Sequence, residues 1–359
     1  GKGHDVTEGG RGVYARFSDD FGRTWSDEVK VVDEPDFGES AVGKGLDEKG
    51  AMLLWVRSFS KDGKRQLLYR STDGRRFEFV SAPPLDPMPV QVTDVFSVPG
   101  RGLMALWFSG WLSGTANSWG TLVSADNGRT WKQTTVETVR DYTQFGTEPS
   151  AVHLGGGRIL AVARTETDRD DLKRQYQLTS ADCGRTWKRR RTNIADVHYS
   201  TPSLIYDRET GLVYNYHYER GKGLLKRRVC RASEVFDRPD AWPDGEVIGT
   251  GGKSPPDSGN ANATAAGGRH FVAYYSGNAP DTGIFVQQVP SVSVKKVQLG
   301  DMRADGRPKT RWRGFNLGEM CAKTGEAPPP FYEETFRLIR ELGFNFARIP
   351  LDYRYWIEG

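Results

Sequence analysis

Three charged residues in the middle of the chain flank strand-like runs in positions where they could do chemistry. Glu148 comes just before the apolar positions Val152 and Leu154, and Arg164 ends the apolar run at 159–163. Arg220 closes the run at 215–219 in the same way. Arginine has a planar fork of donors that binds a carboxylate through two hydrogen bonds and never loses its charge. A nearby carboxyl group could transfer protons. These residue types are suited to binding a carboxylate and transferring a proton if the fold brings them together.

The elements that must position these residues repeat along the chain. Close copies of one turn begin at Ser18, Ser71, Ser124 and Ser180, at nearly constant spacing. Each copy has an aspartate, a glycine and a closing tryptophan or phenylalanine, and the copy at 71–77 is one loop residue shorter. Short polar side chains and glycine favour a tight turn between two strands. Recurrence at one period indicates a solenoid, propeller or array.

Runs of alternating or apolar residues precede each turn and predict strands. They lie at 13–17, 51–56, 66–69, 103–108, 120–123, 159–163 and 176–178. The pattern continues without a clean turn motif at 203–206, 212–216, 224–229, 270–275 and 283–286. We predict an all-β chain with a β-propeller of about six blades over residues 1–290, the first blade incomplete.

The turn motif resembles the Asp-box of the sialidase-like proteins, where it joins the third and fourth strands of propeller blades. This resemblance implies an exo-acting glycoside hydrolase that removes a terminal acidic sugar, with sialic acid first among the candidates. It also implies that Glu148 activates the nucleophile and that Arg164 and Arg220 belong to a triad that binds the substrate carboxylate. Asp5 lies in the loop where the family carries its acid/base aspartate.

Two features depart from the family pattern. The first arginine of the triad would lie upstream of residue 1, so the chain looks truncated. No tyrosine stands near Gly259 or Asn260, where the nucleophile would be expected. Tyr199 or Tyr218 could replace it, or Glu148 or Asp257 could activate a water molecule. A hydrolase of another acidic sugar, such as a uronic acid, and a non-catalytic glycan-binding propeller are the alternatives.

Further residues are candidates for contacting the substrate. Arg57 ends an apolar run, and Asp257 and Asn260 lie near the vacant tyrosine position. Trp111 and Trp119 flank a Gly/Ser loop and could stack on sugar rings, whereas Trp55 and Trp107 are predicted to lie in the core.

The last part of the chain has a different character. We predict a linker at 291–308 and a strand, helix and strand within 309–359. The pieces at 313–318, 342–345 and 348–350 resemble the start of the cellulase-like family-five glycoside hydrolases, which are (β/α)₈ barrels. About fifty residues cannot close an eight-stranded barrel, so we expect this tail to be catalytically inactive.

Composition limits the remaining function classes. The net charge is only +4, and the basic runs at 188–191 and 226–228 are predicted to be solvated strand edges rather than nucleic-acid sites. No apolar run is long enough to span a membrane, and Cys183, Cys230 and Cys321 lack a zinc spacing. We therefore predict no cofactor and no metal, and the family resemblance implies a glycan partner. The family resemblance implies a secreted or cell-surface bacterial protein, although no signal peptide is present in this chain.

Overall fold

The computed structural model describes most of the first 291 residues and a few beyond them. The described ranges are 12–61, 63–110, 117–141, 145–165, 167, 169–197, 200–250, 258–278 and 281–291, with 314–316, 337, 340–341 and 346–348. The chain divides into two compact units, Gly1–Val292 and Ser293–Gly359.

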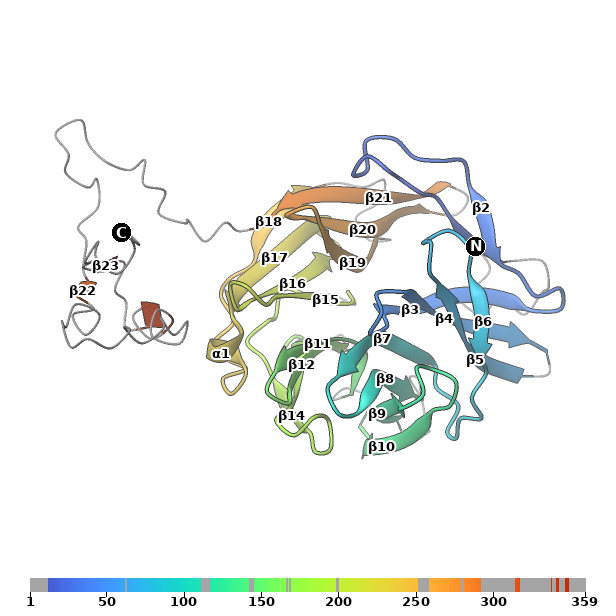
Figure 1. Ribbon diagram of the computed structural model, residues 1–359, viewed down its shortest axis with the longest axis horizontal. Helices are drawn as coiled ribbons and strands as arrows, with labels where there is room; N and C mark the ends of the chain where they lie inside the picture. The colour runs from blue at the N-terminus through green and yellow to red at the C-terminus, as the bar shows by residue number, and fades with distance from the viewer. Residues whose placement is uncertain are drawn as a thin grey trace, which may run out of the picture. The chain divides into compact units, whose positions relative to one another are not determined.

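The first unit is an all-β fold of antiparallel strands (Figure 1). Its first ten strands are β1 (Val13–Ala15), β2 (Val29–Val32), β3 (Gly38–Leu46), β4 (Met52–Ser60), β5 (Gly63–Ser71), β6 (Glu78–Ser81), β7 (Gln91–Val98), β8 (Gly102–Ser109), β9 (Asn117–Ser124) and β10 (Lys132–Val139). The next eleven are β11 (Gly146–Gly155), β12 (Arg158–Thr165), β13 (Tyr176–Ser180), β14 (Lys188–Arg191), β15 (Ser203–Asp207), β16 (Leu212–Glu219), β17 (Leu224–Arg231), β18 (Glu246–Thr250), β19 (Ser258–Ala266), β20 (Arg269–Asn278) and β21 (Asp281–Pro290). One short helix, α1 (Ala232–Val235), follows β17.

The strands form meanders in chain order. β3 to β6 and β7 to β10 are two four-stranded meanders joined into an eight-stranded sheet where β3 meets β7 at Gly45 and Val95. β11 to β14 and β15 to β18 form four-stranded sheets, β19 to β21 form a three-stranded sheet, and β1 pairs with β2. Within each meander, every strand pairs with the next one along the chain.

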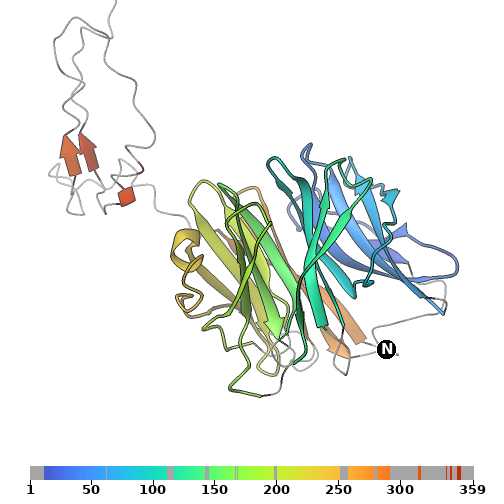
Figure 2. The same cartoon turned by 90° about the horizontal axis from the view of Figure 1, so that it is seen from below.

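The first strands of successive meanders meet one another. β3 contacts β7, β7 contacts β11, β11 contacts β15 and β15 contacts β19. These strands lie toward the middle of the unit, with the later strands of each sheet further out (Figure 1). Figure 2 shows the successive sheets side by side, each twisted relative to its neighbour. The result is a central region lined by first strands.

Four of these first strands carry a β-bulge at the same level. The pairing of each with its second strand is interrupted at Val42 in β3, at Thr93 and Asp94 in β7, at Glu148 and Pro149 in β11, and at Asn260 and Ala261 in β19. A bulge leaves residues unpaired and re-aims their side chains. Proline is tolerated in β11 at this point because it has no N–H to give to the ladder.

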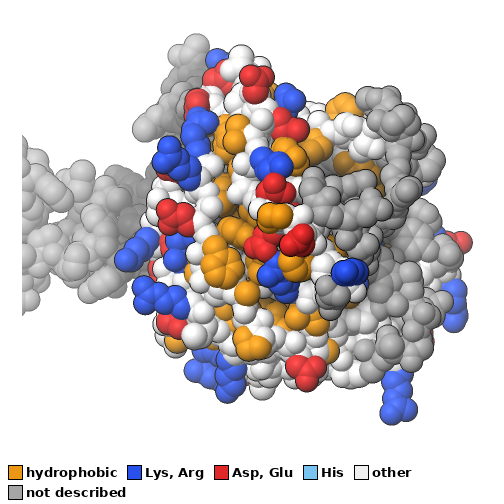
Figure 3. Space-filling model, turned by 90° about the vertical axis from the view of Figure 1, so that its right-hand side faces the viewer, with side chains coloured by type: hydrophobic (Ala, Val, Ile, Leu, Met, Phe, Trp, Pro, Cys, Tyr) orange, Lys and Arg blue, Asp and Glu red, His pale blue; other side chains and the backbone are white. Residues whose placement is uncertain are grey.

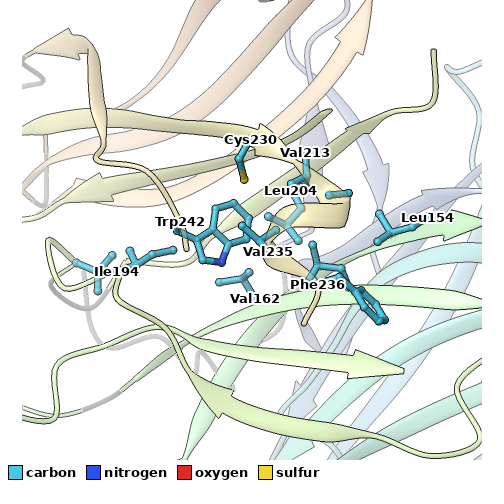
Figure 4. Close-up of a cluster of buried hydrophobic side chains, with 12 residues drawn as sticks. Leu154, Val162, Ile194, Leu204, Val213, Cys230, Val235, Phe236 and Trp242 are labelled. Atoms are coloured by element: carbon cyan, nitrogen blue, oxygen red, sulfur yellow. The ribbon is translucent and has the colours of Figure 1, made fainter. Parts of the chain in front are cut away.

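The core fills the spaces between neighbouring sheets. One cluster packs Val162 of β12, Leu204 of β15 and Val213 of β16 against Phe236 and Trp242, which follow β17 (Figure 4). Another buries Trp55 of β4 and Trp107 of β8 between the two halves of the eight-stranded sheet. The prediction that these two tryptophans lie in the core is confirmed.

The turn motifs have the structure that their residue types predict. In the third copy, the Ser124 hydroxyl accepts the N–H of Gly128 at 2.7 Å, and the Asp126 carboxylate accepts the N–H and hydroxyl of Thr130. Gly128 has a φ of 91° and Asn127 a φ of 58°. The motif joins β9 to β10, the third and fourth strands of their meander, and the equivalent turns join β5 to β6 and β13 to β14.

The two basic runs differ from each other. Residues 188–191 form the outermost strand of their sheet, where Arg189 pairs with Glu137 at 2.8 Å. The run at 226–228 lies on β17, between β16 and β18, and Arg227 and Arg228 are buried. The prediction of a solvated edge was therefore wrong for the second run, because an inner strand of its sheet carries it and the acids Asp196 and Glu246 neutralise it.

Apolar side chains also reach the surface. On the side where β2, β5 and β6 lie, they are mixed with charged groups (Figure 3). Val29 on β2 and Phe79 on β6 are among the exposed large apolar residues. Of the helices in the described part of the chain, none has the length and hydropathy to cross a bilayer.

The second unit is described only in part. β22 (Gly314–Asn316) and β23 (Phe346–Arg348) pair in parallel, and residues 337, 340 and 341 are helical. Both strands coincide with predicted strands. The remainder of the predicted helix lies outside the described residues, so the relation to a cellulase-like barrel stays a prediction.

Candidate functional site

A cavity of about 230 Å³, called the central pocket below, lies among the first strands. Five charged side chains line it: Arg57, Asp94, Glu148, Arg164 and Arg220. Its other lining residues are uncharged: Ser40, Ala41, Val42, Gln91, Thr93, Pro149, Ser150, Thr201, Pro202, Ser203, Asn260, Ala261 and Asn262. The residues of the four bulges all belong to the lining, whether charged or uncharged. The bulges therefore build much of the pocket wall.

The three arginines come from equivalent places in three sheets. Arg57 lies on β4 opposite Ser40, and Arg164 lies on β12 opposite Thr147. Arg220 directly follows β16. Each is therefore near the end of the second strand of its meander, and the repeating topology brings these ends to one region.

Glu148 and Arg164 form an ion pair. Arg164 Nε lies 2.7 Å from Glu148 Oε2, and the side chains are 8% and 13% exposed. Glu148 has a φ of 47°, a left-handed conformation that is uncommon for a residue other than glycine. The bulge at 148–149 imposes this conformation and directs the glutamate into the central pocket.

Arg220 is held by uncharged groups. Its Nη2 donates to the Tyr275 hydroxyl at 3.0 Å and lies 3.3 Å from Asn260 Oδ1. Its neighbour Glu219 turns away and pairs with Lys222 at 2.7 Å and Lys226 at 2.6 Å. Burial raises the pKa of Glu219, but hydrogen bonds from the two lysines outweigh it and lower the pKa overall. Glu219 is therefore committed to the lysines.

Gly259 explains why no tyrosine stands at the expected position. A β-carbon there would lie 2.8 Å from Arg220 Nε, and the residue has a φ of 141°. Any side chain at 259 would collide with the guanidinium. Tyr275, which pairs with Gly259 across β19 and β20, supplies the phenol that contacts Arg220.

Arg57 is fixed from two directions. Its Nη1 donates to the carbonyl of Val90 at 3.0 Å, and its guanidinium carbon lies 4.4 Å from the centre of the Phe59 ring. A cation over an aromatic face is stabilised electrostatically. Arg57 thus places a third guanidinium at the central pocket, from a sheet that the family pattern did not single out.

Asp94 is the charged lining residue that sequence reasoning missed. Its carboxylate accepts the Ser150 hydroxyl at 2.6 Å and lies 3.2 Å from Lys44 Nζ. The signal that could have found it is positional, because Asp94 lies in the first strand of its meander, as Glu148 does. Three guanidinium groups against two carboxylates leave the lining with net positive charge, which suits an anionic ligand.

The predicted site residues divide into three groups. Glu148, Arg164, Arg220, Arg57 and Asn260 line the central pocket together. Asp5, Trp111 and Asp257 lie outside the described residues, as does Tyr199. Trp119 is a correction: it is 2% exposed, packs edge-to-face on Trp187 and donates to Glu137, so it offers no face to a sugar.

Tyr218 is also unsuited to replace the missing tyrosine. It is fully buried and stacks on Tyr274 with ring centroids 5.3 Å apart. As for metals, no cluster of three or more His, Cys, Asp or Glu side chains suited to bind an ion occurs among the described residues.

Comparisons with known proteins agree with this fold. A family model described as a BNR repeat-like domain matches residues 6–254. A protein of unknown function from Dyadobacter fermentans is similar in structure, with a TM-score of 0.66 and 19% identity over 81% of this chain and 86% of that one. No curated protein matches the sequence.

Two sialidases of known structure are also similar. NanB sialidase from Streptococcus pneumoniae has a TM-score of 0.59 and 14% identity over 80% of this chain and 64% of its own. Trypanosoma rangeli sialidase has a TM-score of 0.52 and 14% identity over 76% of this chain and 48% of its own. At such identities the likeness concerns the fold, which is a sialidase-like arrangement of BNR repeats.

Proposed function

Because the chain belongs to the BNR repeat-like domain family, we propose that it is an exo-acting glycoside hydrolase that removes a terminal acidic sugar from a glycan. Sialic acid is the first candidate for that sugar. The observation that carries the proposal is the meeting of Arg57, Arg164 and Arg220, from three different sheets, at one pocket that also holds Glu148. A pocket with net positive charge is suited to a sugar carboxylate.

The arginines bind the substrate in this scheme. A guanidinium binds a carboxylate through two parallel hydrogen bonds. Arg164 and Arg220 therefore bind the substrate carboxylate, and Arg57 on β4 contacts the same substrate. This contact orients the sugar so that its glycosidic carbon faces Glu148.

Glu148 acts on the attacking group. Paired with Arg164, it is the carboxylate form that accepts a proton, and we assign it to activation of the nucleophile. With Tyr218 buried, a water molecule is the nucleophile that we favour. Asp5 is the proposed proton donor to the leaving group, and Asp257 is a further substrate contact.

We also propose a six-bladed propeller whose first blade includes β1 and β2. Two contacts support this count. Phe21, in the turn between β1 and β2, stacks on Phe271 of β20 with centroids 6.5 Å apart. Arg75, in the turn after β5, pairs with Asp19 at 2.6 Å. The β1–β2 pair thus lies between the last sheet and the first meander.

Other parts of the prediction also remain proposals. They are a propeller at 1–290, a linker at 291–308, a cellulase-like fragment at 309–359 and secretion to the cell exterior. An enzyme for a uronic acid would use the same arginines, so it is the main alternative substrate class. A non-catalytic glycan-binding propeller is the alternative of another class.

Turnover and binding measurements separate these possibilities. The chain and its Glu148→Gln and Arg164→Ala variants are assayed on a fluorogenic sialoside and a panel of fluorogenic uronides, with binding of the free acids followed by calorimetry. We expect hydrolysis of one acidic sugar. Glu148→Gln should reduce kcat by about 100-fold or more, because it removes the base. Arg164→Ala should weaken binding as well.

The controls distinguish the alternatives. Glu209→Gln, on an exposed turn after β15, is the matched control and should leave kcat unchanged. Turnover of a uronide but not of the sialoside would identify uronic acids as the substrate class. Binding of an acidic sugar without turnover of any substrate would contradict the enzyme proposal and support a non-catalytic glycan-binding propeller.

A further inference from the structure

Asp94 and Ser150 make a hydrogen-bonded bridge in the wall of the central pocket. The Ser150 hydroxyl donates to Asp94 Oδ2 at 2.6 Å and accepts the N–H of Leu204 at 2.9 Å. Lys44 Nζ lies 3.2 Å from the other oxygen of Asp94. One residue from each of β3, β7, β11 and β15 is therefore linked in a single chain of contacts, which joins these four first strands near the bulges of β3, β7 and β11.

Ser150 is the residue at which the Glu148 bulge ends. Thr147 pairs with Arg164 and Ser150 pairs with Val162, while Glu148 and Pro149 between them have no partner on β12. A left-handed glutamate persists only where its surroundings impose it. Backbone pairing fixes the Thr147 end, and the bridge adds side-chain bonds that fix Ser150. The bulge is thus clamped on both sides of the glutamate.

We propose that Asp94 and Ser150 are positioning residues that hold Glu148 in its left-handed conformation. This inference rests on the proposed function for its catalytic readout, but its structural readout is independent. Ser150 is 4% exposed, and its hydroxyl makes hydrogen bonds to both Asp94 and Leu204. Asp94 receives that hydroxyl and extends the clamp to Lys44.

A positioning role for Ser150 should affect kcat much more than KM. The arginines that bind the substrate carboxylate come from β4, β12 and the end of β16, and none of them bonds to Ser150 among the described contacts. Loosening the clamp should therefore displace the base while binding stays nearly intact. A displacement of about 1 Å can reduce the rate by about 100-fold.

The experiment is a double-mutant cycle on the full chain. Ser150→Ala, Asp94→Ala and the double variant are assayed on the acidic sugar that the wild type hydrolyses best, and the Ser150→Ala crystal structure is determined. We expect kcat of each single variant to fall about 10- to 100-fold, with KM of Ser150→Ala changed less than about 2-fold. The double variant should be no worse than the poorer single one, because both residues act through one bond. Ser150→Thr, which keeps a hydroxyl, should recover most of kcat.

Ser81→Ala is the matched control. Ser81 is also a buried serine, and its hydroxyl donates to the Gly128 carbonyl at 2.7 Å away from the central pocket. Ser81→Ala should lower Tm about as much as Ser150→Ala does and leave kcat unchanged. The proposal is overturned if Glu148 keeps its left-handed conformation in Ser150→Ala, or if the loss of kcat equals that of Ser81→Ala. A wild type that hydrolyses no acidic sugar would defeat the proposed function instead, and the conformation of Glu148 in the crystal would still decide the positioning role.

Discussion

At the scale of single residues, burial decides what each charged group can do. Arg164 is neutralised by Glu148, whereas the described partners of Arg220 are the uncharged Asn260 and Tyr275. A buried guanidinium costs free energy unless an anion or several acceptors replace water. An anionic ligand would therefore give the half-buried Arg220 a charged partner that its described contacts lack.

Glu39 on β3 gives a pH prediction. Burial raises its pKa from 4.5 to about 7, although the N–H of Glu34 partly offsets the effect. Because the folded state holds this proton more tightly, its contribution to stability is present below pH 4.5 and is lost as pH rises toward 7. Glu39→Gln should raise Tm at pH 8 and leave it unchanged at pH 4.

Scanning calorimetry at the two pH values checks this prediction. Glu78→Gln on β6, an exposed position, is the control and should change Tm at neither pH. Equal Tm values for Glu39→Gln and the wild type at pH 8 would contradict the raised pKa.

At the scale of elements, the turn motif works through its tryptophan. Trp131 packs on Trp55 with centroids 5.2 Å apart, and Trp187 packs on Trp119 at 5.8 Å. These two motifs thus pack their own meander against the preceding one. The equivalent Trp25 is 46% exposed, so the same motif stabilises the fold less where β1 and β2 lie.

This difference predicts unequal costs for one substitution. Trp131→Ala should lower the free energy of unfolding by about 3 kcal/mol, since it removes a packed aromatic pair. Trp25→Ala, in the same motif, should cost less than about 1.5 kcal/mol because much of the ring stays in water. Urea unfolding of both variants measures the two values. Equal costs would show that the tryptophan acts only within its own turn.

At the scale of the whole molecule, the central pocket belongs to the first unit alone. Every residue that lines it lies between Ser40 and Asn262, and the first unit ends at Val292. The unit has its own cores between successive sheets. We therefore expect the first unit to fold without the second.

Deletion of Ser293–Gly359 tests this independence. The shortened chain should keep the strand signal in circular dichroism, a single cooperative thermal transition and any binding of acidic sugars. Loss of the transition would mean that the second unit completes the core of the first. Retained folding with lost binding would assign part of the site to the second unit.

The sequence by itself determined the local features of this protein. The turn motifs, the strand order and the positions of Glu148, Arg164 and Arg220 near strand ends follow from residue types and period, because turns and alternation are governed by neighbours along the chain. The predicted boundaries of most strands agree with the structure within a few residues.

The tertiary structure alone decided which of these residues meet. It added Asp94 to the central pocket beside Arg57, buried Trp119 against Trp187, and placed Gly259 where a β-carbon would crowd the Arg220 guanidinium. These outcomes depend on which sheets are neighbours and on bulges that re-aim side chains. Such contacts join residues far apart in the chain, so no local pattern contains them.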